Sequence, residues 1–352
     1  MQKYFAAANT ANGFVGWFDD IFDPRTLDFT YIIKGGSGTG KSTLMKKVAT
    51  KAVKDGAECE YYYCSSDPTS LDGIIVRLTD GRKLALLDGT APHMRDPKFP
   101  GAAEEIVNLG EFWCDDILKG QRDEIVSLCD KKAKLFAQAY ADFSAAGTLV
   151  SAQLDEVKSA VLTYKLDAAC ERLLTQRMRE CRIKGGTPHS HVRALSALST
   201  HGEVYFDSFS DCEKVCLTVD SLGTTPLLFE AMLSAAKRLG LDVDRAPMPL
   251  LPNLTEAVRF PQLSMSVVSR TDRQDVKPIN MTRFVDRDAL CDSARSRRRT
   301  LKKAVHELTE AGLEKLAVVR EVHAKVEKIY IGAMDFTRLG SATERLLGRI
   351  FA

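Results

Sequence analysis

Alternating apolar runs and helical patterns indicate an α/β fold in the first hundred residues. Thr30-Tyr-Ile-Ile33 is a β-branched and aromatic run typical of a buried strand. Apolar residues then recur at helical spacing from Leu44 to Ala52, and Asp55-Gly56 ends that pattern. Glu58 to Tyr63 follows as a second strand. The order strand, loop, helix, strand is typical of an α/β sheet.

Two long segments predict helices. Residues 115–182 and 286–328 are nearly free of Gly and Pro and are rich in Ala, Leu, Lys and Glu. Each follows a region of strand patterns. We therefore expect an α/β core with an added helical hairpin or bundle in each half of the chain.

The same order of patterns occurs twice, which indicates an internal duplication. Any two α/β segments share some strand–helix rhythm, so each match alone is weak, but six matches keep the same order. The matched pairs are Thr10-Ala-Asn-Gly13 through Asp19 with Ser199-Thr-His-Gly202 through Asp207, the strand and helix around residues 30–55 with residues 215–240, Pro68–Leu71 with Pro252–Leu254, Leu84–Leu87 with Met265–Val268, Asn108–Phe112 with Asn280–Phe284, and Ala169–Leu174 with Ala342–Leu347.

The loop after the first strand carries the most specific motif. It reads Gly35-Gly36-Ser37-Gly38-Thr39-Gly40-Lys41-Ser42 and matches the phosphate-binding P-loop. Its glycines let consecutive N–H groups point at an anion, and the helix that follows adds partial positive charge. Lys41 is expected to reach the outer phosphates, Ser42 to ligate Mg²⁺, and Thr43 to add a phosphate contact.

These patterns predict a P-loop NTPase-like α/β fold, internally duplicated. We expect an active half over residues 1–183, a linker over 184–191, where Gly and Pro accumulate, and a second half over 192–352. In the second half Thr224-Thr225-Pro226 stands where Gly40-Lys41-Ser42 would recur. Ser269 ends the strand that corresponds to the one ending in Asp88. This half is therefore predicted to be structural or regulatory, or to hold a nucleotide without turnover.

Four residues are predicted to act in catalysis, namely Lys41, Asp88, Asp67 and His93. Asp88 follows the apolar run 84–87, and we expect it to hold the Mg²⁺ shell together with Ser42. A hairpin turn at Asp80-Gly81 would make its strand antiparallel to the preceding one without excluding the site.

The neighbouring loops leave alternatives open. His93 is expected to sense the outer phosphate or act as a base, or else to be a surface group. Arg95 on the same loop is a candidate for charge stabilisation. Asp67, after Cys64-Ser-Ser at the end of a strand, either orients water, binds a second substrate, or caps a turn.

Composition narrows the classes of function. The chain has 352 residues, a formal net charge of +2 and nine scattered cysteines. These values favour a reduced, cytoplasmic protein and give no sign of nucleic-acid binding. No run reaches the length of a membrane span, and the N-terminus lacks a secretory pattern. The basic run Arg295–Lys303 is expected to be a solvated helix face.

Several segments together resemble one family. They are "FAAANTANGF", "IIKGGSGTGKSTLMKK", "CSSDPTSLDG", "LDGTAPH", "DPKFPGAAEEIVNLGEFW" and the late "AMDF". The chain resembles a group of bacterial P-loop ATP-binding proteins built of two P-loop-type halves and described as ATPases. The resemblance implies ATP binding by Gly35 to Thr43, with the segments at Cys64–Asp67 and Asp88–His93 near the site. The second half departs from that family because its loop lacks the lysine.

We therefore expect a Mg²⁺-dependent ATP-binding protein, an ATPase with one active loop. The absence of an N-K-x-D motif favours ATP over GTP. Two alternatives stay open. In a small-molecule or nucleotide kinase, the loops at Cys64 and Asp88 would bind an acceptor. In an ATP-gated interaction module, the long helices would respond to ATP and contact a protein partner. The oligomeric state is left open.

Overall fold

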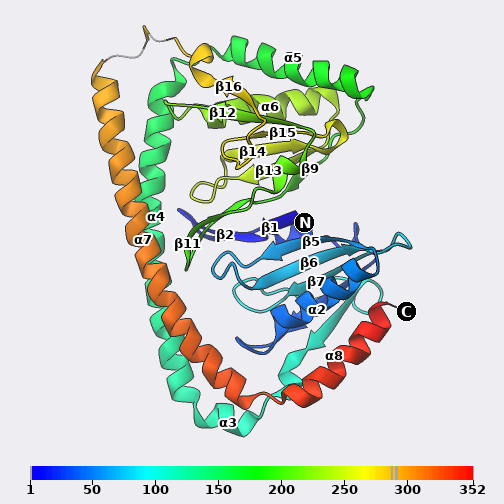
Figure 1. Cartoon of the computed structure of the whole chain (residues 1–352). Helices are drawn as coiled ribbons and strands as arrows, with labels where there is room; N and C mark the ends of the chain where they lie inside the picture. Colours follow the sequence, from blue (N-terminus) through cyan, green and yellow to red (C-terminus); the bar gives the residue numbers. More distant parts are fainter. Residues whose placement is uncertain (1, 287, 290–291, 352) are drawn as a thin grey trace.

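Two similar α/β halves lie beside a pair of long helices (Figure 1). The computed structural model describes residues 2–286, 288–289 and 292–351, without the side chains of residues 292–296. Each half contains a six-stranded mixed sheet. The first sheet has the order β1 (Gln2–Phe5), β5 (Glu58–Tyr63), β6 (Leu71–Arg77), β7 (Lys83–Asp88), β4 (Phe29–Lys34) and β8 (Glu104–Asn108).

The second sheet repeats this order strand for strand. In the matching direction it runs β9 (Ser190–Val192), β13 (Val243–Pro247), β14 (Thr255–Phe260), β15 (Met265–Val268), β12 (Lys214–Val219) and β16 (Lys277–Asn280). In each sheet one strand, β6 or β14, is antiparallel to both neighbours. The predicted α/β fold and the predicted duplication are therefore confirmed, and so is the hairpin turn at Asp80-Gly81 between β6 and β7.

A small hairpin in each half shows the duplication at the level of hydrogen bonds. The hairpins are β2 (Ala7–Thr10) with β3 (Gly13–Gly16), and β10 (Ser196–Ser199) with β11 (Gly202–Tyr205). The Thr10 hydroxyl donates to Gly13 O and accepts from Asn12 N, and the Ser199 hydroxyl makes the same two bonds to Gly202 and His201. The predicted match between these two turns is confirmed.

Helices complete each half. After the loops come α2 (Lys41–Lys54) and α6 (Thr225–Leu239). The arm consists of α4 (Arg122–Lys158) and α7 (Asp292–Ala333), and the final helices are α5 (Thr163–Cys181) and α8 (Phe336–Ile350). The remaining short helices are α1 (Phe18–Ile21), α3 (Asp115–Gly120), η1 (Leu109–Phe112), η2 (Ser208–Asp211), η3 (Pro261–Leu263) and η4 (Met281–Phe284).

The two halves exchange their final helices. Helix α4 leads away from the first half, and α5 then packs on the second, where Leu166, Cys170 and Leu174 join the core around α6. Helix α7 returns, and α8 packs on the first half through Leu339 and Leu346. The sequence division at residues 184–191 therefore does not separate the packing units. Ser190 and His191, predicted as linker, belong to the edge strand β9, which pairs with β13.

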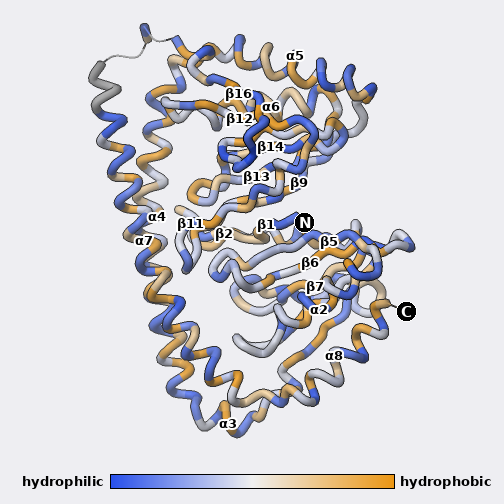
Figure 2. Tube along the Cα trace, viewed as in Figure 1, coloured by the Kyte–Doolittle hydropathy of each residue, from blue (hydrophilic) through white to orange (hydrophobic). Residues whose placement is uncertain are grey.

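The arm is an antiparallel helix pair (Figure 1) with apolar positions recurring along both helices (Figure 2). Phe143 of α4 packs with Leu313 and Leu316 of α7. Gly312 allows this approach, because a Cβ there would lie 2.7 Å from Phe143 Cδ1.

Ion pairs join the two helices of the arm. Lys315 Nζ lies 2.5 Å from Asp142 Oδ2, and Arg297, in the predicted basic face, lies 2.7 Å from Glu156 Oε1. The side chains of Arg295 and Ser296 in that run lie outside the described residues. Among the described helices, none combines the length and the apolar character that a membrane crossing requires.

We expect Gly312→Val to lower the free energy of unfolding by about 1–3 kcal/mol, because the added carbons overlap the Phe143 ring. Gly332→Val in the same helix is the matched control, since a Cβ there meets nothing within 4 Å. Its effect should stay within about 0.5 kcal/mol. Urea unfolding of the two variants measures both, and equal losses would contradict this account of the arm.

Candidate functional site

The glycine-rich loop Gly35–Gly40 lies between β4 and α2, as the sequence predicted. Gly38 and Gly40 have φ values of +71° and +91°, a left-handed region that favours glycine. Lys41, the first residue of α2, folds its side chain back over the loop. Its Nζ donates to Gly35 O at 2.8 Å and to Gly36 O at 2.7 Å. A half-buried ammonium group and the start of a helix thus meet at one place, which favours an anion.

Threonine hydroxyl groups donate hydrogen bonds to carbonyl groups of this loop. Thr39 is buried and donates to Gly36 O at 2.9 Å. Thr90 donates to Gly35 O at 3.0 Å. The Ser42 hydroxyl accepts a hydrogen bond from Leu71 N at 3.0 Å, so its own proton and a second lone pair remain for other partners. Thr43 is exposed.

Asp88 lies next to Lys41, because β7 runs parallel to β4 and pairs Asp88 with Ile33. The carboxylate accepts from Thr90 N at 2.8 Å through Oδ1, and its Oδ2 lies 3.5 Å from Lys41 Nζ. The structure therefore brings Asp88 next to Lys41, and Ser42 follows Lys41 in the first turn of α2.

His93 is not a surface group, contrary to the alternative that the sequence left open. Its side chain is only 6% exposed, and its ring stacks on Phe18 with centroids 4.6 Å apart. Nδ1 lies 2.9 Å from Asp88 O, and Nε2 lies 3.7 Å from Asp72 Oδ1. His93 is buried because its loop folds back over the end of β7.

Sequence reasoning missed Asp72, which lies near the start of β6 and is buried. Burial raises the pKa of this carboxyl to about 6, against a smaller opposing effect from His93. The available signal was a carboxylate followed by an apolar strand run, Ile74 to Val76, since a buried acid needs a partner or a function.

Asp67 caps its own turn. Its Oδ1 accepts from Thr69 N at 3.0 Å and from the Thr69 hydroxyl at 2.7 Å. It also lies 3.9 Å from His201 Nε2 in the hairpin of the second half. The turn-cap alternative is therefore confirmed, and the catalytic role stays a prediction.

Arg95 does not face the loop, so its proposed role in stabilising transferred charge is wrong for this arrangement. Its guanidinium is buried beside Glu104, with NH2 3.1 Å from Oε1, and it donates to Phe18 O and Phe22 O. These bonds fix the segment after Asp88, because a buried cation requires such partners.

Helix α7 covers part of the glycine-rich loop, a contact that no local pattern predicted. A Cβ at Gly36 would lie 2.6 Å from Tyr330 Cε1, and one at Gly38 would lie 2.8 Å from Ile331 Cγ1. The loop glycines therefore serve two purposes, since they also allow this helix to approach.

The arm also brings charged groups toward the loop. Burial, aided by Lys132, lowers the pKa of His323 to about 4, so this imidazole is neutral at pH 7. Lys132 Nζ of α4 lies 3.4 Å from His323 Nδ1. Burial and the charge of Asp67 raise the pKa of Glu327 on α7, while Lys41 opposes that rise. Residues of both halves thus influence the same site.

In the second half, the Asp220 carboxylate accepts hydrogen bonds from the backbone of its own loop. Asp220 Oδ1 accepts from Leu222 N at 2.8 Å and from Gly223 N at 3.0 Å. Its Oδ2 accepts from Thr225 N at 2.6 Å and from the Thr225 hydroxyl at 2.8 Å. A carboxylate of the chain itself therefore accepts from the N–H groups at the start of α6, a position that favours anions.

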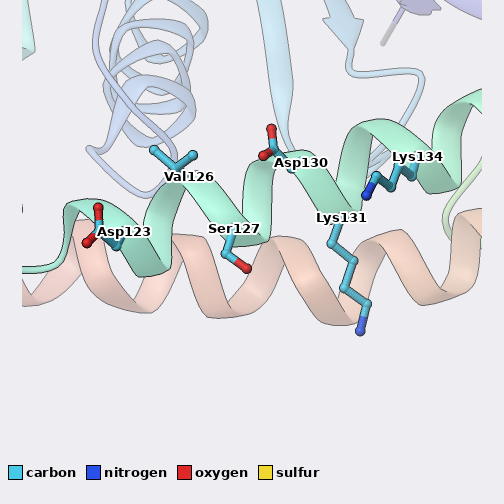
Figure 3. A pocket seen from close by; sticks show the side chains of 6 residues that line it. All are labelled: Asp123, Val126, Ser127, Asp130, Lys131 and Lys134. Atoms are coloured by element: carbon cyan, nitrogen blue, oxygen red, sulfur yellow. The ribbon is translucent and has the colours of Figure 1, made fainter.

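A shallow hollow of about 520 Å³ on α4 is a poor candidate for the site. All its lining residues come from this single helix, and they are Asp123, Val126, Ser127, Asp130, Lys131 and Lys134 (Figure 3). Figure 3 shows Asp130 and Lys131 pointing in different directions. These charges do not converge on one point, whereas those around Lys41 do.

We expect Asp220→Ala to lower the free energy of unfolding by about 1–3 kcal/mol, because several N–H groups lose their acceptor. Asp220→Asn keeps one oxygen acceptor and should lower the free energy of unfolding by less than Asp220→Ala does. The exposed Asp130 gives the control, since Asp130→Ala should change stability by no more than about 0.5 kcal/mol. Chemical denaturation measures all three, and a neutral Asp220→Ala would contradict the internal-anion account.

Comparisons with known proteins supply no further identification. A scan against protein-family models, a search of curated proteins and a search of solved structures each found no match. The resemblance to P-loop ATP-binding proteins therefore remains one of motifs, and the functional argument rests on the geometry around Lys41.

Proposed function

We propose that this protein binds ATP with Mg²⁺ at the loop Gly35–Thr43 and hydrolyses it. The observation that carries this proposal is the convergence of Lys41, the start of α2 and the Asp88 carboxylate. Lys41 and the loop amides would stabilise the charge on the outer phosphates, which is the principal requirement of phosphoryl transfer. Its two present acceptors, Gly35 O and Gly36 O, already orient Nζ over the loop.

The residues around Lys41 fit a magnesium ion. Ser42 offers a hydroxyl oxygen and Asp88 offers carboxylate oxygens, and Mg²⁺ prefers oxygen ligands that it shares with phosphates. When bound, the ion neutralises charge on the phosphates. Asp88 and Ser42 would hold it, while the Asp88–Thr90 bond fixes the carboxylate.

We expect Lys41→Ala to reduce ATP hydrolysis by about a hundredfold or more, because a positioned cation is lost from the transition state. Lys47→Ala is the control, since Lys47 is an exposed lysine of the same helix. Phosphate release and ATP binding are measured on the same samples with Mg²⁺. Equal binding and turnover in wild type and Lys41→Ala would refute the proposal.

Wild-type binding without turnover would leave ATP binding in place and exclude intrinsic hydrolysis. Consumption of ATP that begins only when a small-molecule or nucleotide acceptor is added would then favour the kinase alternative over hydrolysis.

One observation favours an ATP-gated module as a second candidate. Tyr330 and Ile331 of the arm pack directly on Gly36 and Gly38. A change of the loop on binding triphosphate would therefore act on α7, which runs along α4 to the second half (Figure 1). Trp113 reports on this contact, because its ring lies 5.9 Å from that of Tyr330.

We expect ATP to change the fluorescence of Trp113 in a Trp17→Phe variant, which leaves one tryptophan in the chain. The change should saturate with ATP and disappear when Lys41→Ala is added. ATP binding with unchanged emission would count against the gated arm, while leaving the ATPase proposal intact.

A further inference from the structure

Three potential metal ligands meet beside the P-loop. Asp72 comes from β6, Asp88 from the end of β7, and His93 from the following loop. One ligand atom of each lies within 4.8 Å of the others. Asp72 and Asp88 are distant in sequence, so no local pattern shows that they meet. The antiparallel pairing of β6 with β7 brings them together.

The hydrogen bonding of His93 fixes which nitrogen faces this set. Nδ1 lies 2.9 Å from the Asp88 carbonyl oxygen, which can only accept, so Nδ1 carries the proton in a neutral ring. Nε2 then presents its lone pair at 3.7 Å from Asp72 Oδ1. This distance is too long for a hydrogen bond, and a neutral Nε2 has no proton to donate.

That arrangement suits a cation between the ligands. The side chains of Asp72 and His93 are each only 6% exposed, so water screens them poorly. Among the residues that the structure describes, neither Lys nor Arg forms an ion pair with Asp72. A histidine whose Nδ1–H is held by a carbonyl group and whose Nε2 faces carboxylates has the usual setting of a metal ligand.

The ring is also held in place. Phe18 stacks on His93 with centroids 4.6 Å apart. The Thr90 amide holds Asp88 Oδ1 at 2.8 Å. Both supports are independent of any ligand, so the set is preorganised in the folded chain.

We propose that Asp72, Asp88 and Nε2 of His93 bind a divalent transition-metal ion, distinct from the Mg²⁺ that accompanies ATP. One imidazole and two carboxylates suit Mn²⁺ or Zn²⁺, whereas Mg²⁺ prefers oxygen ligands alone. This metal site does not depend on nucleotide binding. It rests on the proposed function only in that Asp88 belongs to both sites, so the metal would lie beside the outer phosphates.

Mn²⁺ binding to the full-length protein without nucleotide tests the proposal. Electron paramagnetic resonance measures free Mn²⁺, and spin-echo modulation detects a directly bound imidazole nitrogen. We expect one bound ion, nitrogen modulation, and poor competition by equimolar Mg²⁺. His93→Gln should weaken binding about tenfold or more and abolish the modulation. His189→Gln, at a histidine with 64% exposed side chain, is the control and should change neither.

Asp72→Asn keeps the shape of its side chain and gives a second variant should His93→Gln fail to fold. It should also weaken Mn²⁺ binding about tenfold. Lys41→Ala separates the two proposals, because it should lose ATP and keep Mn²⁺. Wild-type protein that binds no Mn²⁺, or Mn²⁺ binding unchanged in His93→Gln and Asp72→Asn, would overturn the metal site without touching the ATP site.

Discussion

Backbone N–H groups at the start of a helix need an acceptor, and the two halves of this chain meet that need differently. In the second half Asp220 supplies a carboxylate from within the loop, so N–H groups at the start of α6 already have an acceptor. In the first half the corresponding loop contains four glycines and no carboxylate, and Lys41 adds positive charge to it.

The exchange of the final helices makes the cores of the two halves depend on each other. Because α8 packs on the first half and α5 on the second, neither core is complete within one contiguous stretch of chain. Helix α7 also lies over Gly36 and Gly38, where Tyr330 and Ile331 contact the loop. The second half, although its loop is filled, thereby contributes to the environment of the first. This is a physical reason for a chain to keep a copy without the lysine.

Local patterns predicted the parts of the structure that local chemistry determines. The strand at Thr30–Ile33, the helix after Lys41, the turn at Asp80-Gly81 and the paired turns at Thr10 and Ser199 all formed as expected. Long-range packing decided the rest. Burial of Asp72 and His93, the inward turn of Arg95 and the contact of Tyr330 with Gly36 depend on segments distant in sequence. Sequence periodicity gives no information on such contacts. The exchange of α5 and α8 between the halves was not predicted for the same reason.

A crystal structure with Mg²⁺ and a non-hydrolysable ATP analogue tests the central claim most directly. The account predicts one analogue per chain, with its outer phosphates between Lys41 and the start of α2, and an undisturbed Asp220 in the second loop. A triphosphate at residues 220–225, or protein saturated with analogue whose first loop holds no phosphate, would contradict it.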